Sequence, residues 1–338
     1  MKKLISAATA LCLAIALAAC GTPSSSVSSA PSSSPSSSIS EPSVPIHIAG
    51  MKGPTTMGMV KLMKDAEDGT ANGNYQIDMY ATAQEILPLL VKGEIDAAML
   101  PANVASNIYT KTEGKVQVAA INTLGVLYVV ENGSSIQSVK DLAGKTIYST
   151  GKGNTPEYIL NYILQQNGIA DQVTVEYKSE ATEVTATMAE AGEGAVAVLP
   201  QPYATIATSQ AEGMRVALDL TKEWSKVNPN CQLVTGVLVA RTNFIEQNQA
   251  AFEQFLSDYS ASIGYVNENT AEAAQLVAGY GIVPKAPLAE KALPACNITY
   301  IDGSEMKTVL RGYLQVLFDQ NPASVGGAMP GDNFYYGA

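Results

Sequence analysis

Two short turns of similar sequence are the part of this chain best equipped to hold a ligand. Lys52-Gly53-Pro54-Thr55 and Lys152-Gly153-Asn154-Thr155 carry lysine, glycine and threonine at the same spacing. Each turn combines a cation, a glycine that lets a ligand approach the backbone, and a hydroxyl. If each turn opens a helix, the free N–H groups of that helix add a partial positive charge. Such a set suits a carboxylate, sulfonate, phosphate or polar ring; the alternative is that both lysines are solvated surface residues.

The two turns belong to an internal repeat with a period of about one hundred residues. Lys92–Pro101 and Ala191–Pro200 form a second aligned block, and each shows a Gly-Glu turn, a short apolar strand and then Leu-Pro. Two blocks that recur in the same order at nearly the same offset favour a duplicated fold over chance similarity between Gly-rich loops.

Each copy is expected to alternate strands and helices. In the first copy Tyr75, Ile77 and Met79 alternate with polar residues, which is typical of a strand. In the second copy Thr155 is expected to cap a helix and Pro156 to occupy its first position. Alternating strands and helices predict parallel βαβ units. The expected fold class is therefore α/β, with two similar lobes, each a mostly parallel sheet flanked by helices.

The rest of the chain is expected to return to the first lobe, because no third copy of the repeat follows residue 235. This predicts a first lobe of residues 46–124 and 235–338 and a second lobe of residues 125–234. Leu124–Glu131 and Leu233–Ala240 are the expected crossover strands of a two-strand hinge. Apolar stripes at helical spacing predict core helices near residues 252–266 and 304–318.

The candidate site follows from this architecture. In open α/β sheets ligands bind beyond the carboxyl ends of the strands, so the loops of two lobes would face each other across a cleft. The residues expected to bind the ligand are Met51, Lys52, Gly53, Thr55, Thr82, Asn103, Thr123, Thr150, Gly151, Lys152, Gly153, Asn154, Thr155, Gln201 and Tyr203.

Composition lowers the odds of several other functions. The net charge is −11, whereas a nucleic-acid binder needs a basic surface, so no nucleic-acid partner is expected. The chain has one histidine, His47, which argues against a His-based metal site or a catalytic triad. His47 begins the first expected strand and is interpreted as an edge residue. We expect no catalytic residue, no metal and no cofactor.

The N-terminal residues are interpreted as a targeting signal for export. Lys2 and Lys3 precede the apolar stretch Leu4–Ala16, which is too short to span a bilayer, and Leu17-Ala18-Ala19-Cys20 follows. This pattern resembles the cleavage signal of bacterial lipoproteins, which implies a signal peptide at 1–19 and acyl chains on Cys20. Residues 20–45 are rich in Ser and Pro, which predicts a tether between membrane and folded body.

Two further cysteines, Cys231 and Cys296, leave two alternatives open. An exported protein can join them in a disulfide. They can equally be two free thiols that behave as small apolar groups in the core.

Two motifs resemble a known family. Ser138–Ile147 is similar to the "S-x-x-D-L-x-G-K" entry to the second lobe of type II periplasmic binding proteins. Gly93–Ala98 matches the Gly-Glu-x-Asp-x-Ala turn of binders of nitrate, sulfonate, taurine and thiamine-pyrimidine precursors. With the lipoprotein signal, the chain resembles the solute-binding lipoproteins of ABC importers.

The resemblance implies a monomer, anchored by lipid on the extracytoplasmic face of the cell membrane. It would bind a small polar or anionic solute between its lobes and deliver it to an ABC permease, without being an enzyme. The three arginines, Arg215, Arg241 and Arg311, lie outside the candidate loops, and the aromatic side chains Tyr80, Tyr203 and Trp224 offer stacking to a ring instead.

Two other classes of function remain open from the sequence. One is an enzyme on the same fold, similar to the menaquinone-pathway dehydratases, which are typically cytoplasmic and so fit the lipoprotein signal poorly. The other is a surface lipoprotein that acts as a sensor or adhesin.

Overall fold

The computed structural model describes residues 44–338, beginning with strand β1 (Pro45–Met51) one residue before the expected start at Ile46. The predicted signal peptide at 1–19, the lipidation site Cys20 and the predicted tether as far as residue 43 lie outside the described residues. Pro42–Ala338 form one compact unit. In the described part of the chain, no helix combines the length and the apolar character that crossing a bilayer requires.

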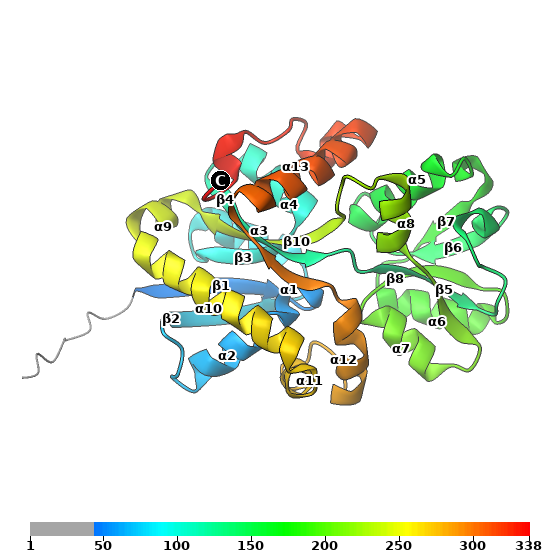
Figure 1. Ribbon diagram of the computed structural model, residues 1–338, viewed down its shortest axis with the longest axis horizontal. Helices are drawn as coiled ribbons and strands as arrows, with labels where there is room; N and C mark the ends of the chain where they lie inside the picture. Colours follow the sequence, from blue (N-terminus) through cyan, green and yellow to red (C-terminus); the bar gives the residue numbers. More distant parts are fainter. Residues whose placement is uncertain (1–43) are drawn as a thin grey trace, which may run out of the picture. The chain divides into compact units, whose positions relative to one another are not determined.

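The strands form two sheets (Figure 1). The first sheet has six strands in the order β11-β4-β10-β3-β1-β2, and the second has five in the order β7-β6-β8-β5-β9. Besides β1, the first sheet contains β2 (Asn74–Tyr80), β3 (Ala97–Pro101), β4 (Val116–Leu124), β10 (Val234–Arg241) and β11 (Ile298–Ile301). The second contains β5 (Leu127–Asn132), β6 (Thr146–Ser149), β7 (Thr174–Tyr177), β8 (Val196–Pro200) and β9 (Met214–Asp219).

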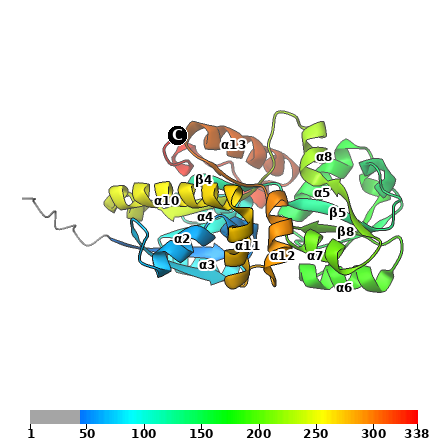
Figure 2. The same cartoon turned by 60° about the horizontal axis from the view of Figure 1, so that its bottom comes forward.

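Helices flank both sheets (Figures 1 and 2). Those that precede or follow strands of the first sheet are α1 (Pro54–Met57), α2 (Val60–Glu67), α3 (Ala83–Lys92), α4 (Ala102–Lys111), α9 (Thr242–Gln247), α10 (Gln249–Glu268), α11 (Thr270–Gly279), α12 (Ala286–Ala292) and α13 (Gly303–Gln320). Those among the strands of the second sheet are α5 (Thr155–Gln166), α6 (Ala181–Ala191), α7 (Tyr203–Gln210) and α8 (Leu220–Val227). Short 3-10 turns are η1 (Val139–Leu142), η2 (Ala170–Gln172), η3 (Leu293–Ala295), η4 (Pro322–Val325) and η5 (Asp332–Phe334).

The sheets are mixed, which corrects the expectation of mostly parallel sheets. β1 runs parallel to β2 and β3, and β6 runs parallel to β7 and β8, as the βαβ units predict. β10 lies antiparallel between β3 and β4, and β5 lies antiparallel between β8 and β9. The reason is that the chain enters β5 and β10 from the other sheet, so neither strand follows a βαβ unit of its own sheet that would make it parallel to a neighbour.

The two sheets repeat one plan. β1 pairs with β3 through Ile48 and Ala97, and β6 pairs with β8 through Ile147 and Val196. β3 and β8 both end in Leu-Pro, and both have an antiparallel partner there, with Pro101 opposite Gly236 and Pro200 opposite Leu127. The duplication seen in the sequence is thus a duplication of topology.

Glycines let the chain pass closely between the sheets at both crossovers. A Cβ on Gly125, between β4 and β5, would collide with the hydroxyl of Thr221. A Cβ on Gly236, in β10, would lie 2.5 Å from both Asn122 Oδ1 and Thr55 Cγ2. Real Cβ atoms do not approach so closely, so these backbone segments require glycine. The residue limits of the two lobes stay a prediction.

The predicted core helices are confirmed. In α10 the buried side chains include Phe252, Phe255 and Tyr259, and in α13 they include Leu310 and Tyr313. One core cluster is continuous from the first sheet to the second. Tyr162 of α5 packs on Trp224 of α8 at 4.7 Å between ring centroids, and Trp224 packs on Tyr313 at 5.9 Å. Trp224 is fully buried in this packing, so it is a core residue and has no free face for a ligand.

Candidate functional site

A cavity of about 300 Å³ lies where strand ends of both sheets meet helix starts. β1 contributes Met51, and the Leu-Pro ends of β3 and β8 contribute Pro101 and Pro200. The starts of β5 and β10, where the chain passes from one sheet to the other, also line the cavity. The lining residues are Met51, Ala81, Thr82, Ala83, Gln84, Pro101, Asn103, Val104, Val126, Leu127, Asn154, Thr155, Pro156, Pro200 and Thr235.

Three helix N-termini converge on this cavity. The residues before α3, α4 and α5 are Thr82, Pro101 and Asn154, and none of their side chains makes a capping hydrogen bond to the described residues of its helix. These helices have ten, ten and twelve residues, so each presents unbonded backbone N–H groups in its first turn, although α5 lacks the N–H of Pro156. The N–H groups and helix dipoles favour a hydrogen-bond acceptor or a negative charge beside them.

A hydrogen bond joins two of these helices across the cavity. The hydroxyl of Thr155, in α5, donates to Asn103 Oδ1, in α4, at 3.1 Å, and both side chains are buried. This corrects the expected cap: Asn154 precedes the helix, Thr155 is its first residue and Pro156 its second. The Thr155 hydroxyl does not cap its own helix because it bonds to the opposite one.

The walls of the cavity are mostly apolar, and its polar groups are uncharged. Met51, Val104, Val126 and Leu127 line it together with three prolines. The polar lining comes from hydroxyls and amides, and no lining residue is acidic or basic. The cavity therefore suits a molecule with an apolar body and a hydrogen-bonding head.

The cavity brings together some of the predicted site residues. Met51, Thr82, Asn103, Asn154 and Thr155 line it. The other predicted residues lie outside its lining: Lys52, Gly53, Thr55, Thr123, Thr150, Gly151, Lys152, Gly153, Gln201 and Tyr203. Lys52 and Lys152 are exposed.

Thr55 and Thr123 are buried in a polar cluster beside strand β10. Thr123 donates to Asn122 Oδ1 at 3.0 Å, and the Asn122 amide donates to the Thr55 carbonyl at 3.4 Å. Gly236 of β10 packs directly against Asn122 and Thr55. These two threonines therefore hold α1, β4 and β10 together.

The remaining predicted residues of the second copy have other surroundings. Gln201 is buried, and its side-chain oxygen accepts from the Thr205 N–H at 3.3 Å. Tyr203 lines a separate groove between α6, α7 and the segment before α12. Gly151 and Gly153 adopt positive φ angles of 76° and 75°, so they shape the turn that leads into α5.

Sequence reasoning missed Gln84, Val104, Val126, Leu127 and Thr235, which also line the cavity. Gln84 lies two residues beyond the predicted Thr82, inside α3, and Val104 lies one residue beyond the predicted Asn103, inside α4. Val126, Leu127 and Thr235 come from the two crossovers, which the sequence treated as a hinge only. These three residues could have been predicted, because both crossover segments must pass beside any cleft between the two sheets.

The two family motifs have structural roles. Gly93 ends α3 in a left-handed conformation with φ 81°. Asp96 then accepts from the His47 N–H at 2.9 Å and pairs with Arg241. His47 is thus tied into the first sheet through its backbone.

Ser138 and Asp141 form a capping box around η1, and Gly144 follows with φ 77°. Hydrogen bonds from the backbone N–H groups of Gln137 and Ser138 hold the pKa of Asp141 below its usual value. Both motifs therefore report the fold, and neither contacts the cavity.

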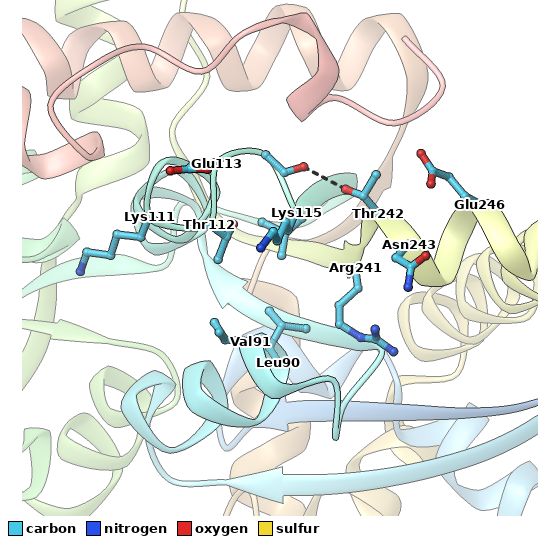
Figure 3. A pocket seen from close by; sticks show the side chains of 12 residues that line it. Leu90, Val91, Lys111, Thr112, Glu113, Lys115, Arg241, Thr242, Asn243 and Glu246 are labelled. Carbon is cyan, nitrogen blue, oxygen red and sulfur yellow. Dashed lines mark hydrogen bonds between the residues drawn. The ribbon is translucent and has the colours of Figure 1, made fainter.

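A larger pocket, of about 590 Å³, lies elsewhere on the first-sheet side of the molecule (Figure 3). It is open between the end of α3, the end of α4 and the start of α9, beyond the opposite ends of β3 and β10. Arg241 is a half-buried cation in its lining, but this side chain is engaged by Asp96 and by the Ile95 carbonyl at 3.0 Å. Volume does not decide function, and the convergence of helix N-termini favours the smaller cavity.

Cys231 and Cys296 are free thiols, so the disulfide considered from the sequence is not formed. Cys231 lies 3.6 Å from the Gln232 carbonyl, whereas Cys296 is buried 3.7 Å from the sulfur of Met57. Burial raises the pKa of Cys231 to about 11 and that of Cys296 to about 12, which keeps both thiols protonated at neutral pH. Within residues 44–338 no cluster of His, Cys, Asp and Glu could hold a metal ion.

Comparisons with known proteins agree with this architecture. The family model described as "NMT1/THI5 like" matches residues 77–273. No curated protein matches the chain. An ABC transporter protein from Parabacteroides distasonis is 24% identical with a TM-score of 0.71, covering 86% of this chain and 98% of its own.

Two further solved structures share the fold at lower identity. The periplasmic aliphatic sulphonate binding protein SsuA from Escherichia coli is 18% identical with a TM-score of 0.67, covering 82% of this chain and 88% of its own. A Candida albicans protein with the generic periplasmic binding protein fold is 11% identical with a TM-score of 0.56, covering 86% and 93%. The chain belongs to the NMT1/THI5-like family and has the periplasmic binding protein fold.

Proposed function

We propose that this protein is an extracytoplasmic solute-binding lipoprotein of an ABC importer. It captures a small polar or anionic molecule in the cavity between the two sheets and delivers that molecule to a permease. The observation that carries the proposal is the convergence of three uncapped helix N-termini on one apolar cavity. The similarity to the structures of an ABC transporter protein and a sulphonate binder supports it.

Binding is favoured over catalysis by the chemistry of the lining. The cavity walls carry hydroxyls, amides and apolar groups, and none of the lining residues is a histidine, cysteine, lysine or carboxylate. General acid–base and nucleophilic catalysis depend on such side chains. A cavity of this kind can hold and release a molecule, and we infer no reaction for it.

A thermal-shift screen of the mature protein tests the binding role. Small anions and polar heterocycles are added one at a time, and the midpoint of unfolding is measured. A ligand at one hundred times its Kd stabilises the folded state by about 2.7 kcal/mol, which gives a clear shift. Failure of every small solute to stabilise the protein, with no permease recovered together with it from membranes, would favour a sensor or adhesin role.

Attachment to the membrane is tested separately through Cys20. The proposed acyl chains on this residue would anchor the protein, since each buried CH₂ contributes about 0.8 kcal/mol. Cys20→Ser should release the protein from the membrane fraction into the soluble fraction. If the Cys20→Ser protein still sediments with membranes after a salt wash, the lipid-anchor proposal is wrong.

A further inference from the structure

Thr235 lies at an irregularity in strand β10 where the chain enters the first sheet. Val234 pairs with Leu124 and Gly236 pairs with Thr123, so two steps along β10 match a single step along β4. Thr235 is the extra residue of this bulge. Bulges bend a strand and re-aim a side chain, and they are frequent beside binding sites.

The bulge places Thr235 in the lining of the cavity described above. Its neighbour Gly236 is pressed against Asn122 and Thr55, where no Cβ fits. The backbone on that side therefore cannot shift to turn Thr235 away without disturbing β4 and α1.

The Thr235 hydroxyl is buried and makes no hydrogen bond with any residue from 44 to 338. A buried hydroxyl without a partner is costly, because it has lost water and gained nothing in return. By contrast, the other buried hydroxyl of the cavity, on Thr155, already donates to Asn103. Thr235 lines the cavity as a residue, and its buried hydroxyl is without a hydrogen-bond partner among residues 44–338.

We propose that Thr235 determines ligand specificity by donating a hydrogen bond to an acceptor on the bound solute. This inference rests on the proposed function. The free N–H groups of α3, α4 and α5 are also donors, so the matching head group is rich in acceptors, such as a sulfonate, carboxylate or carbonyl. The solute class is a small organic molecule with such a head on an apolar body.

Three probes with a common phenylmethyl body test this inference. Phenylmethanesulfonate has an acceptor head, benzylamine has a cationic donor head, and toluene has no head group. Each is titrated into the mature protein, and binding is followed by NMR of the Met51 methyl group, which lines the cavity. The Met188 methyl group, buried in a separate core cluster, serves as the remote control.

In the wild-type protein we expect phenylmethanesulfonate to bind more tightly than toluene, and benzylamine to bind most weakly. Thr235→Val keeps the shape of the side chain and removes the hydroxyl. It should weaken phenylmethanesulfonate about three- to tenfold and leave toluene unchanged. Thr235→Ser keeps the hydroxyl and should retain the preference for the sulfonate.

A second measurement separates a binding role from a structural one. Without any probe, Thr235→Val should unfold at the same temperature as the wild type or at a higher one, because it removes a hydroxyl without a partner. A lower unfolding temperature for Thr235→Val would show that the hydroxyl stabilises the fold, and would overturn the inference.

The probe results also distinguish the two proposals. If the wild type binds the probes but Thr235→Val weakens all of them equally or none of them, the role of Thr235 is refuted while the binding function stands. If no probe shifts the Met51 signal in the wild type, the cavity does not accept this class of molecule and the inference about Thr235 is overturned, while the thermal-shift screen decides the binding function.

Discussion

The two copies of the repeat use the same Lys-Gly-x-Thr turn in different ways. In the first copy the turn leads into α1, which has four residues and ends at Gly58. In the second it leads into α5, which has twelve. Thr55 is consequently packed beneath β10, whereas Thr155 reaches the cavity and bonds to Asn103. A shared sequence pattern thus reports shared ancestry of the fold, and the helix that follows decides whether the turn serves the site.

Both copies place an arginine–carboxylate pair on the antiparallel strand beside β3 or β8, but that strand contributes opposite charges in the two copies. In the first sheet Arg241 comes from β10 and pairs with Asp96, which precedes β3. In the second, the carboxylate Glu131 comes from β5, the strand equivalent to β10, and pairs with Arg215 of β9 at 2.8 Å. The two equivalent strands have thus exchanged the sign of the charge they carry, and their partners come from different elements.

The tight packing around the first turn is the feature with the largest expected effect. Gly236→Ala would push a Cβ against Asn122 and Thr55, so it should lower the free energy of unfolding by about 1–3 kcal/mol. Gly264→Ala is the matched control, because a Cβ there meets nothing within 4 Å in helix α10, and it should stabilise by about 0.5–1 kcal/mol. Urea denaturation measures both, and equal stability of the two variants would contradict the packing described for the first copy.

The exchanged ion pair of the second sheet predicts a dependence of stability on pH. Burial acts to raise the pKa of Glu131, but hydrogen bonds from Ser135 and Ile136 and the charge of Arg215 outweigh it and hold the pKa below that of an ordinary glutamate. A carboxyl whose pKa is lowered by folding stabilises the protein above its unfolded pKa, and this contribution is lost as pH falls through the folded pKa.

Glu131→Gln should therefore be less stable than the wild type at pH 7, and the gap should narrow as the pH falls below about 4.5. Thermal unfolding across a pH series measures the gap. A gap that stays constant down to pH 2 would show that the charge of Glu131 contributes nothing to stability.

The hydrogen bond from Thr155 to Asn103 joins the second turn to helix α4, and the first turn makes no equivalent bond among the described residues. Thr155→Val leaves the buried Asn103 oxygen without this donor and should cost about 1–3 kcal/mol. A double-mutant cycle with Asn103→Ala measures the coupling between the two side chains. The same cycle between Thr55→Val and Asn103→Ala should give no coupling, and coupling of similar size in both cycles would remove the distinction between the copies.

The two lysines are expected to matter least. Lys52 and Lys152 are exposed and lie outside the cavity lining, so water screens their charges. Lys52→Ala and Lys152→Ala should each change the Kd of phenylmethanesulfonate by less than about twofold, or roughly 0.4 kcal/mol. A tenfold loss for Lys152→Ala alone would mean that this lysine folds over the bound anion, and would sharpen the contrast between the turns.

The α/β fold class and its main elements could be predicted from the sequence, because buried faces recur periodically along strands and helices. The alternation in β2, the stripes of α10 and α13 and the aligned Leu-Pro ends all follow from which faces are buried. The direction of β5 and β10 was not predictable in the same way. A strand that joins two sheets appears in the sequence as an apolar run, and that run is the same whether the strand lies parallel or antiparallel to its neighbours.

The site was less predictable because proximity across a cavity is a tertiary property. The sequence found Thr155 but assigned its hydroxyl to its own helix, since nothing local indicates that Asn103 lies 3.1 Å away. Thr235 was missed because a bulge depends on the pairing of two strands distant in the chain. Lys52 and Lys152 stay predictions as ligand-binding residues: the sequence shows that the cation recurs, but not which way its side chain points, and both side chains are exposed outside the cavity lining.

The buried aromatic packing between α5, α8 and α13 contains an intrinsic fluorescence probe. Trp224 is the sole tryptophan of the chain, so its emission can be assigned without any label. Its ring lies between Tyr162, from the second copy of the repeat, and Tyr313, from the C-terminal segment. Any movement of one half of the molecule against the other would change the polarity and quenching around this single fluorophore, which makes ligand-driven closure measurable in the native protein.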